Sequence, residues 1–259
     1  MKVYFIGAGP GAADLITLRG AKILRQCKMV LYAGSLIPED MLQHCQPDAE
    51  LLDTAKLDLE QQQECYQRAK QSGIDVARLH SGDPAIYGAT AEQMRRLDNL
   101  NIEYEIIPGV SSFSAAAAAI NSELTKPQIS QSIILTRVSG RASAVPELES
   151  IDKFAKHQAT MCIFLSGPHL KKIVADLLLH YPPTTPVALV YRATWPEQKQ
   201  YKGTLDTILQ DTKTDNWNLT TMLLVGSVLD DSLQVESSLY NKDFTHIFRV
   251  PKKNRQTES

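Results

Sequence analysis

Short apolar runs alternate along this chain with longer amphipathic stretches. In the first half, the runs at residues 3–6, 29–32, 75–79 and 104–107 are rich in apolar and β-branched residues and have the length of strands. Between the first two, residues 14–27 carry leucine, isoleucine and alanine on roughly one face, which predicts a helix. Because alternating strands and helices are typical of a mainly parallel sheet, we expect an α/β fold.

The second half of the chain repeats this pattern. Its strand candidates are residues 132–136, 160–165, 186–191 and 222–226. Before them, Pro108 and Gly109 end a strand, and Ser111 or Ser112 could cap an alanine-rich helix. With a boundary near Asn121, the sequence predicts an α/β domain at residues 1–120, a second α/β domain at 121–250 and a mobile tail at 251–259.

Composition and charge narrow the class of protein. The formal net charge of -2 gives no bulk attraction for nucleic acid or an anionic membrane, so neither is expected as a partner. The chain starts directly in a predicted strand, without the pattern of a secretory signal, and no apolar run reaches membrane-spanning length. We therefore expect a cytoplasmic protein. The 4 cysteines lack CxxC spacing and the 6 histidines are scattered, which predicts reduced thiols and no metal site.

A first glycine motif, GAGPGA, follows the first predicted strand. Gly7, Gly9 and Gly11 leave the backbone open to close approach by a ligand, and on its own the motif is similar to a dinucleotide-binding fingerprint. Pro10 removes an N–H that could bind pyrophosphate, and the second strand ends in Tyr-Ala-Gly, without the acidic residue that binds a ribose. Both features disfavour a nicotinamide-dependent dehydrogenase, while a purely structural turn stays possible.

Two further glycine turns follow later strands. The segment HSGDPAIYG contains Asp83, which could cap the next helix or contact a ligand, and the residues alone leave both roles open. The segment IIPGVSSF ends a strand and offers the hydroxyls of Ser111 and Ser112. Because the carboxyl ends of parallel strands meet at one edge of a sheet, we expect the three turns to converge on one site.

These three segments, in this order, resemble the signatures of the tetrapyrrole (corrin and porphyrin) methylase family. The resemblance extends over residues 3–249. Within the family, one branch methylates carbon C11 of precorrin-4 or its cobalt-bearing equivalent in cobalamin biosynthesis. The segments that resemble this branch are LYAGSLIP at residues 31–38, ELTKPQISQSIILTR at 123–137, VYRATWPEQ at 190–198 and FTHIFR at 244–249.

The resemblance implies two α/β domains with a cleft between them, a homodimer, and S-adenosylmethionine as the methyl donor in the cleft. The positions that match the family's cofactor-binding residues are Pro10, Ser81, Gly82, Asp83, Ile86, Ser111, Ser112, Ser166, Ala193, Thr220 and Thr221. Ser166 and Ala193 stand where uroporphyrinogen-III methylases commonly have methionine and glycine, which favours another branch.

The expected reaction is transfer of a methyl group to C11 of the tetrapyrrole, which needs alignment of donor and acceptor rather than a metal or a protein nucleophile. Asp83 is the candidate orienting group and proton acceptor. The substrate's carboxylates require cations, and its ring requires flat apolar surface. We assign Arg192, Arg137 and Tyr87 to this role, with Arg78, Arg141, Phe113 and Trp195 as further candidates. The alternatives are a methylase acting on another substrate, a dehydrogenase or a non-catalytic tetrapyrrole carrier.

Overall fold

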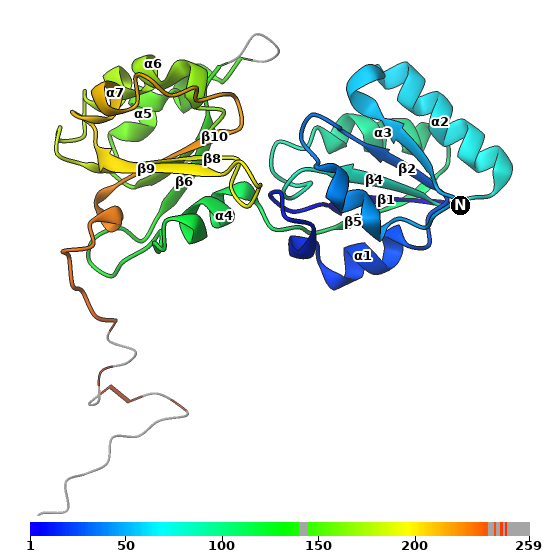
Figure 1. Cartoon of the computed structure of the whole chain (residues 1–259), viewed down its shortest axis with the longest axis horizontal. Coiled ribbons are helices and arrows are strands. Elements are labelled where there is room, and N and C mark those ends of the chain that lie inside the picture. The colour runs from blue at the N-terminus through cyan, green and yellow to red at the C-terminus, as the bar shows by residue number, and fades with distance from the viewer. Residues whose placement is uncertain (140–143, 238–240, 242–243, 246, 248–259) are drawn as a thin grey trace, which may run out of the picture. The chain divides into compact units, whose positions relative to one another are not determined.

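The computed structural model describes residues 1–139, 144–237, 241, 244–245 and 247. The predicted tail at 251–259 and the candidate Arg141 lie outside these residues. The chain divides into two compact units (Figure 1). Unit 1 comprises Met1–Ile120, Val190–Gln200 and Thr220–Met222, and unit 2 comprises Asn121–Leu189, Tyr201–Leu219 and Leu223–Ser259. The linear division at Asn121 stays a prediction, and two short later segments belong with unit 1.

A parallel sheet forms the centre of unit 1. Its 5 strands lie in the order β3-β2-β4-β1-β5, and every neighbouring pair is parallel. They are β1 (Lys2–Gly7), β2 (Met29–Tyr32), β3 (Glu50–Asp53), β4 (Val76–His80) and β5 (Glu103–Ile107). The helices are α1 (Leu18–Leu24), α2 (Leu59–Ser72), α3 (Thr90–Asn99) and α4 (Ser112–Ala119). The predicted strands and the parallel sheet are confirmed.

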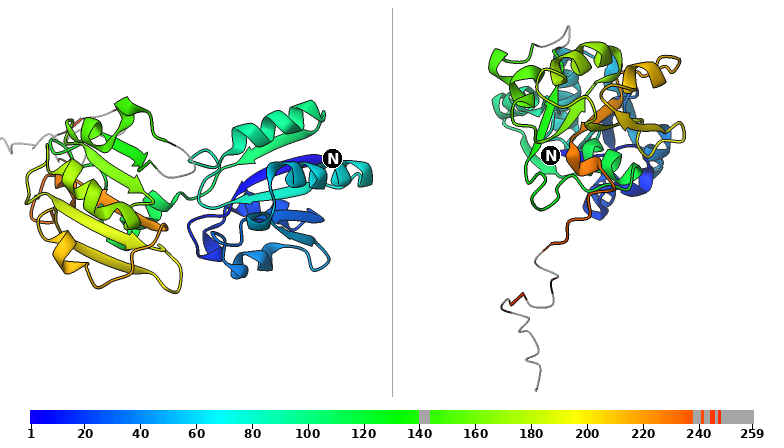
Figure 2. Two further views of the ribbon diagram at one scale, coloured as in Figure 1. Left: turned by 90° about the horizontal axis from the view of Figure 1, so that it is seen from above. Right: turned by 90° about the vertical axis from the view of Figure 1, so that its left-hand side faces the viewer.

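Alternation of side chains along β1 gives unit 1 two apolar layers. Phe5 is fully buried and packs with Tyr66 of α2 and Leu97 of α3. Its neighbour Ile6 points to the opposite face and packs with Leu24 of α1. Helices therefore cover both faces of the sheet (Figure 2).

The helix predicted over residues 14–27 is shorter than expected. A 3₁₀ turn at Ala13–Leu15 is followed by extended backbone at Ile16, and α1 begins only at Leu18. The Thr17 hydroxyl accepts a hydrogen bond from the Gly20 N–H and so caps the helix. A β-branched residue followed by a good N-cap residue explains this late start.

The second sheet is mixed. Its strand order is β6-β7-β10-β8-β9, with β6 parallel to β7 and β10 antiparallel to β7. The strands are β6 (Ile133–Arg137), β7 (Thr160–Phe164), β8 (Pro186–Tyr191), β9 (Lys199–Thr204) and β10 (Thr221–Val225). The helices of unit 2 are α5 (Ile151–Ala155), α6 (Leu170–Leu177) and α7 (Ile208–Asp211). No helix in the described part of the chain is both long and apolar enough to cross a bilayer.

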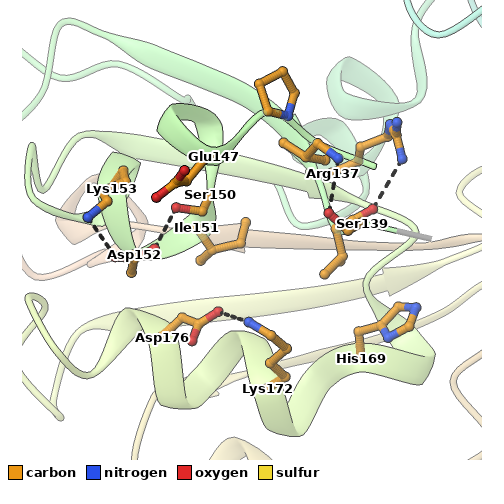
Figure 3. A pocket seen from close by; sticks show the side chains of 13 residues that line it. Arg137, Ser139, Glu147, Ser150, Ile151, Asp152, Lys153, His169, Lys172 and Asp176 are labelled. Carbon is orange, nitrogen blue, oxygen red and sulfur yellow. Dashed lines mark hydrogen bonds and ion pairs between the residues drawn. The ribbon is translucent and has the colours of Figure 1, made fainter. Parts of the chain in front are cut away.

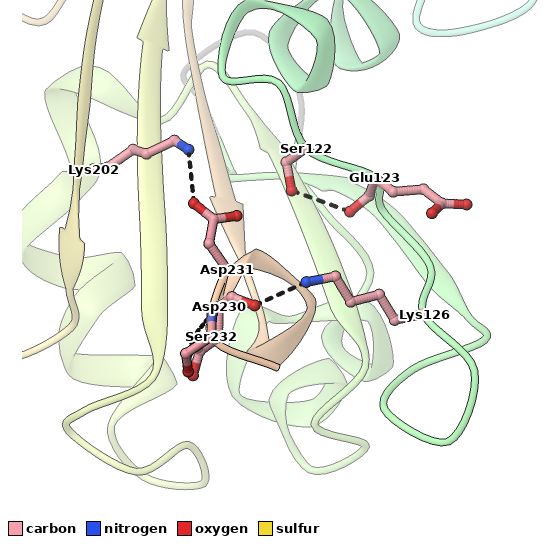
Figure 4. Close-up of polar contacts among 7 residues, drawn as sticks. All are labelled: Ser122, Glu123, Lys126, Lys202, Asp230, Asp231 and Ser232. Atoms are coloured by element: carbon pink, nitrogen blue, oxygen red, sulfur yellow. Dashed lines mark hydrogen bonds and ion pairs between the residues drawn. The ribbon is translucent and has the colours of Figure 1, made fainter. Parts of the chain in front are cut away.

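Polar contacts tie the segment after β10 to the rest of unit 2 (Figure 4). The Lys126 Nζ donates to the Asp230 carbonyl oxygen at 2.8 Å, and Lys202 lies 3.5 Å from the Asp231 carboxylate. Hydrogen bonds from Ser232 lower the pKa of Asp230. Lys126 lies in the segment 123–137, which resembles the C11-methylating branch of the family, and it therefore has a structural contact in this unit.

Candidate functional site

Three glycine turns meet at the carboxyl edge of the unit 1 sheet, where β4, β1 and β5 are neighbours. The Gly9 N–H donates to the Gly82 carbonyl at 3.2 Å, and the Gly82 N–H donates back to the Gly9 carbonyl at 2.7 Å. Ala8 N–H also donates to the His80 carbonyl at 2.8 Å. The predicted convergence is confirmed, and we call residues 7–12, 80–83 and 107–112 the turn cluster.

Close backbone packing explains part of the glycine pattern in the turn cluster. A Cβ atom at Gly7 would lie 2.5 Å from the Gly109 Cα, and one at Gly109 would overlap the Gly82 carbonyl oxygen. At Gly82 itself a Cβ would have its nearest neighbour at 3.6 Å, but the residue has a φ of +67°, which favours glycine. At Gly82 the structure therefore shows a requirement of backbone conformation, and the close approach of a ligand to this residue stays a prediction.

Asp83 links the second and third glycine turns by hydrogen bonds. Its Oδ1 accepts from the Ala85 N–H at 2.8 Å, and its Oδ2 accepts from the Gly109 N–H at 2.8 Å. It does not cap the next helix, since α3 begins at Thr90 and its N-cap residue is Ala89. The capping alternative is thus wrong, and the ligand and proton-acceptor roles of Asp83 stay predictions.

The other predicted residues of the second and third turns differ in their exposure to solvent. Ser81 and Tyr87 are exposed, Ile86 is half-buried, and Tyr87 has a φ of 55°. Ser111 is buried and precedes α4, yet its hydroxyl makes no capping hydrogen bond there. Ser112 is the first residue of α4. The buried Ser111 hydroxyl is therefore left for another partner.

A segment from late in the chain contacts the first glycine turn within unit 1. Trp195 Nε1 donates to the Pro10 carbonyl oxygen at 2.9 Å. The Ala12 N–H donates to the Thr194 Oγ1 at 2.9 Å. A Cβ at Gly11 would overlap the Trp195 indole ring. The sequence predicted Trp195 only as flat surface and missed Thr194, because no local signal links residues 185 positions apart.

Arg192 and its neighbours lie in the same segment. The Arg192 guanidinium stacks on the Trp195 ring, 4.7 Å from its centroid, and its NH1 lies 3.4 Å from the Glu197 Oε2. Its backbone N–H donates to the Thr220 carbonyl at 3.2 Å. Ala193 is buried, and Thr221 is buried in β10. The structure thus places Pro10, Arg192, Ala193, Thr220 and Thr221 in one unit with the turn cluster.

Ser166 and Arg137 belong to unit 2. Ser166 is buried just after β7. Arg137, at the end of β6, lines a cavity of about 390 Å³, and its NH1 donates to the Val138 carbonyl at 3.2 Å (Figure 3). Two ion pairs line the same cavity, Lys172 with Asp176 at 2.5 Å and Lys153 with Asp152 at 3.8 Å. That Ser166 and Arg137 share a site with the turn cluster stays a prediction.

Arg78 is not a substrate cation. Its side chain is buried in unit 1, where Nε donates to Gln93 Oε1 at 3.1 Å and NH1 donates to the Leu79 carbonyl at 3.1 Å. Burial, and secondarily the nearby Arg78 charge, lowers the pKa of His80 to about 3. Since side chains alternate along a strand, Arg78 and His80 of β4 share the face covered by α2 and α3, and the sequence-based interpretation of Arg78 is wrong.

Comparison with known proteins identifies the class that this fold and turn cluster define. The family model of tetrapyrrole (corrin/porphyrin) methylases matches residues 2–209, and the chain belongs to this family. Within the family, the chain is 49% identical to a precorrin-4 C(11)-methyltransferase of Pseudomonas aeruginosa, over 96% of this chain and 99% of that protein. It is 42% identical to a cobalt-precorrin-4 C(11)-methyltransferase of Methanocaldococcus jannaschii, over 96% of both chains.

A solved structure agrees with this placement. The X-ray structure of a cobalt precorrin-4 methyltransferase superposes with a TM-score of 0.85 at 43% identity, covering 88% of this chain and 96% of that one. The expected α/β tetrapyrrole methylase fold is confirmed.

Proposed function

We propose that this protein transfers a methyl group from S-adenosylmethionine to carbon C11 of precorrin-4 or cobalt-precorrin-4, a step of cobalamin biosynthesis. The observation that carries the proposal is the match of nearly the whole chain, at 49% identity, to a precorrin-4 C(11)-methyltransferase. The turn cluster supports it, because interlocked glycine turns at a sheet edge offer backbone groups to a ligand without side chains in the way.

The residues of the turn cluster fit S-adenosylmethionine. A Cβ at Gly82 would meet no atom closer than 3.6 Å, the buried Ser111 hydroxyl is not used for capping, and the first N–H groups of α4, which begins at Ser112, have no partner within the helix. When bound, the cofactor supplies a methyl group already activated on sulfonium. The residues proposed to hold it are Pro10, Ser81, Gly82, Asp83, Ile86, Ser111, Ser112, Ser166, Ala193, Thr220 and Thr221.

The protein's own contribution is to orient the tetrapyrrole. Its carboxylates require cations in fixed directions, and Arg192 offers a guanidinium held flat against an indole ring. Arg137 and Tyr87 complete the proposed substrate set. Asp83 orients the reacting groups through the turns that it fastens and accepts the proton that the methylated ring redistributes.

The test is incubation of the protein with S-adenosylmethionine and, separately, precorrin-4, cobalt-precorrin-4 and uroporphyrinogen III. We expect a gain of one methyl group on at least one of the precorrin-4 substrates, located at C11 by isotope labelling, and none on uroporphyrinogen III. Methylation at another carbon, or of uroporphyrinogen III alone, would move the protein to a different branch of the family. The same assay decides whether the cobalt-bearing form is preferred.

We further propose that the protein works as a homodimer in the cytoplasm, without a nucleic-acid partner. The family resemblance supports the dimer. The cysteines Cys27, Cys45, Cys65 and Cys162 are free, and burial raises the pKa of the Cys27 and Cys162 thiols to about 12, as expected for inert thiols in a reducing compartment. Light scattering on the purified protein tests the dimer by its mass.

A further inference from the structure

Trp195 contacts two parts of unit 1 that serve different ligands in the proposed reaction. The edge of its indole donates to the Pro10 carbonyl at 2.9 Å, in the turn assigned to the cofactor. The face of the same ring carries the guanidinium of Arg192, the residue assigned to the tetrapyrrole, at 4.7 Å. One rigid side chain thus connects the two.

The backbone around Trp195 is held in an uncommon conformation. Arg192 and Thr194 have φ angles of 46° and 71°, in the left-handed region that non-glycine residues rarely adopt. Local hydrogen bonds maintain this loop: the Thr194 N–H donates to Gln198 Oε1 at 2.6 Å, and the Trp195 N–H donates to the Arg192 carbonyl at 3.0 Å. Such conformations persist only where the surroundings fix them, so the loop holds the indole in one orientation.

The partner turn is shaped to receive this ring. Gly11 faces the indole so closely that a Cβ would overlap Trp195 and lie 2.9 Å from the Thr194 Oγ1. The Ala12 N–H donates to that same hydroxyl at 2.9 Å. Trp195 and Thr194 therefore fix consecutive residues of the first glycine turn, Pro10 to Ala12.

We propose that Trp195 is a positioning residue that sets the first glycine turn for S-adenosylmethionine and, through its other side, Arg192 for a substrate carboxylate. The inference rests on the proposed function and adds a residue to it. Glu197 lies 3.4 Å from the Arg192 NH1, and in the proposed complex the substrate carboxylate takes that place while the indole keeps the guanidinium plane fixed.

Two substitutions separate the two roles. Trp195→Phe removes the indole N–H but keeps an aromatic face, so the dissociation constant of S-adenosylhomocysteine should rise about two- to tenfold while the KM for the tetrapyrrole changes less. Trp195→Leu removes both, so the dissociation constant and the KM should both rise. Calorimetry gives the first quantity and initial rates give the second. Trp217→Phe, at the other tryptophan of the chain, is the matched control and should change neither.

A double-mutant cycle of Gly11 and Trp195 tests the contact between these two residues directly. Gly11→Ala should weaken S-adenosylhomocysteine binding at least tenfold in the wild-type background, because the new methyl group overlaps the indole. In a Trp195→Ala background the same change should matter several-fold less. Trp195→Ala and Gly11→Ala effects that simply multiply would overturn the proposal, since residues in contact are expected to couple.

Fluorescence of the folded full-length chain supplies a readout that a general loss of stability does not reproduce. In Trp217→Phe the remaining emission comes from Trp195, and addition of S-adenosylhomocysteine should change its intensity or wavelength. If wild-type protein binds no S-adenosylhomocysteine, the proposed function fails. If it binds, yet Trp195→Phe and Trp195→Leu bind equally well with unchanged KM, only the positioning role fails.

Discussion

At the scale of single residues, Arg192 is a cation whose direction is fixed by contacts within the protein. Its guanidinium stacks on Trp195 and its NH1 faces Glu197, so the side chain is oriented without being neutralised by a buried partner. Arg192 could be selected from the sequence because it follows a predicted strand. Its stacking on Trp195 depends on a left-handed backbone conformation at Arg192, which no residue pattern predicts.

Replacing Arg192 with Ala should raise the KM for the tetrapyrrole while sparing the affinity for S-adenosylhomocysteine. A charge-assisted hydrogen bond contributes about 1.5 to 3 kcal/mol, which corresponds to about tenfold to somewhat above a hundredfold. Arg192→Lys should recover only part, because a point charge cannot reproduce a planar fork. Steady-state kinetics and calorimetry measure the two effects. An unchanged KM would remove Arg192 from the proposed substrate set.

Asp83 accepts hydrogen bonds from two backbone N–H groups and is also the proposed proton acceptor. Asp83→Asn keeps one acceptor oxygen but turns its amide group toward a backbone N–H, so S-adenosylhomocysteine affinity should fall about tenfold. If the carboxylate also accepts a proton, kcat should fall further, by about a hundredfold or more. Asp53→Asn is the control outside the turn cluster, at a carboxylate whose Oδ1 accepts from the Gly34 and Ala55 N–H groups. Full turnover in Asp83→Asn would exclude the proton-acceptor role.

His80 should make unit 1 less stable in acid. Its pKa in the folded protein, about 3, lies below the usual 6.5, so below pH 6.5 the unfolded chain takes up a proton that the folded chain does not. Stability is then lost as the pH falls from about 6.5 toward 3, by about 1.4 kcal/mol per unit from this group. Ring resonances of His80 followed by NMR should not titrate between pH 8 and 5. Titration near pH 6.5 would contradict the buried neutral form, and His157→Gln, at an exposed histidine, should leave the acid sensitivity unchanged.

At the scale of elements, the strands were predictable where burial is greatest. β4 and β10 are buried at all 5 positions; the apolar run MLLV predicts β10, while β4 is predicted from Val76, Ala77 and Leu79 although Arg78 and His80 interrupt its apolar pattern. The edge strands β3 and β9 were missed, since ELLD lacks β-branched residues and KQYKGT is mostly polar. The sequence also predicted that the glycine turns converge, because parallel strands fix which edge they share. It could not tell which glycine is required for packing and which for conformation.

The glycines of the turn cluster should therefore respond differently to the same added methyl group. Gly109→Ala forces overlap with the Gly82 carbonyl and should abolish S-adenosylhomocysteine binding or prevent folding of unit 1. The methyl group of Gly82→Ala meets no atom closer than 3.6 Å and is disfavoured only by the positive φ of this residue. We therefore expect a loss of about 1 kcal/mol in stability, and measurable binding of S-adenosylhomocysteine. Thermal unfolding and calorimetry compare the two variants. Equal effects would mean that the turns can move apart to admit a side chain at Gly109.

At the scale of the whole molecule, the first unit is not continuous in sequence. The segments Val190–Gln200 and Thr220–Met222 belong with Met1–Ile120, and they contribute Thr194 and Trp195 to the first glycine turn. The local patterns predicted the central strands of both halves of the chain. The pairing of Pro10 with Trp195, 185 residues away, depends on tertiary contacts that periodicity and spacing do not encode.

The consequence can be tested with a fragment of residues 1–120. It contains all 5 strands of the unit 1 sheet and helices α1 to α4, so circular dichroism should report folded α/β structure. It lacks the hydroxyl that accepts from Ala12 and the indole that donates to Pro10, and two lost hydrogen bonds should weaken S-adenosylhomocysteine binding about tenfold to a hundredfold or more. The full-length double variant Thr194→Ala/Trp195→Leu is the matched comparison and should show a loss of similar direction. Should the fragment bind S-adenosylhomocysteine as tightly as the full chain, the later segments would have no part in the cofactor site, and Ser166, Ala193, Thr220 and Thr221 would leave the proposed set together.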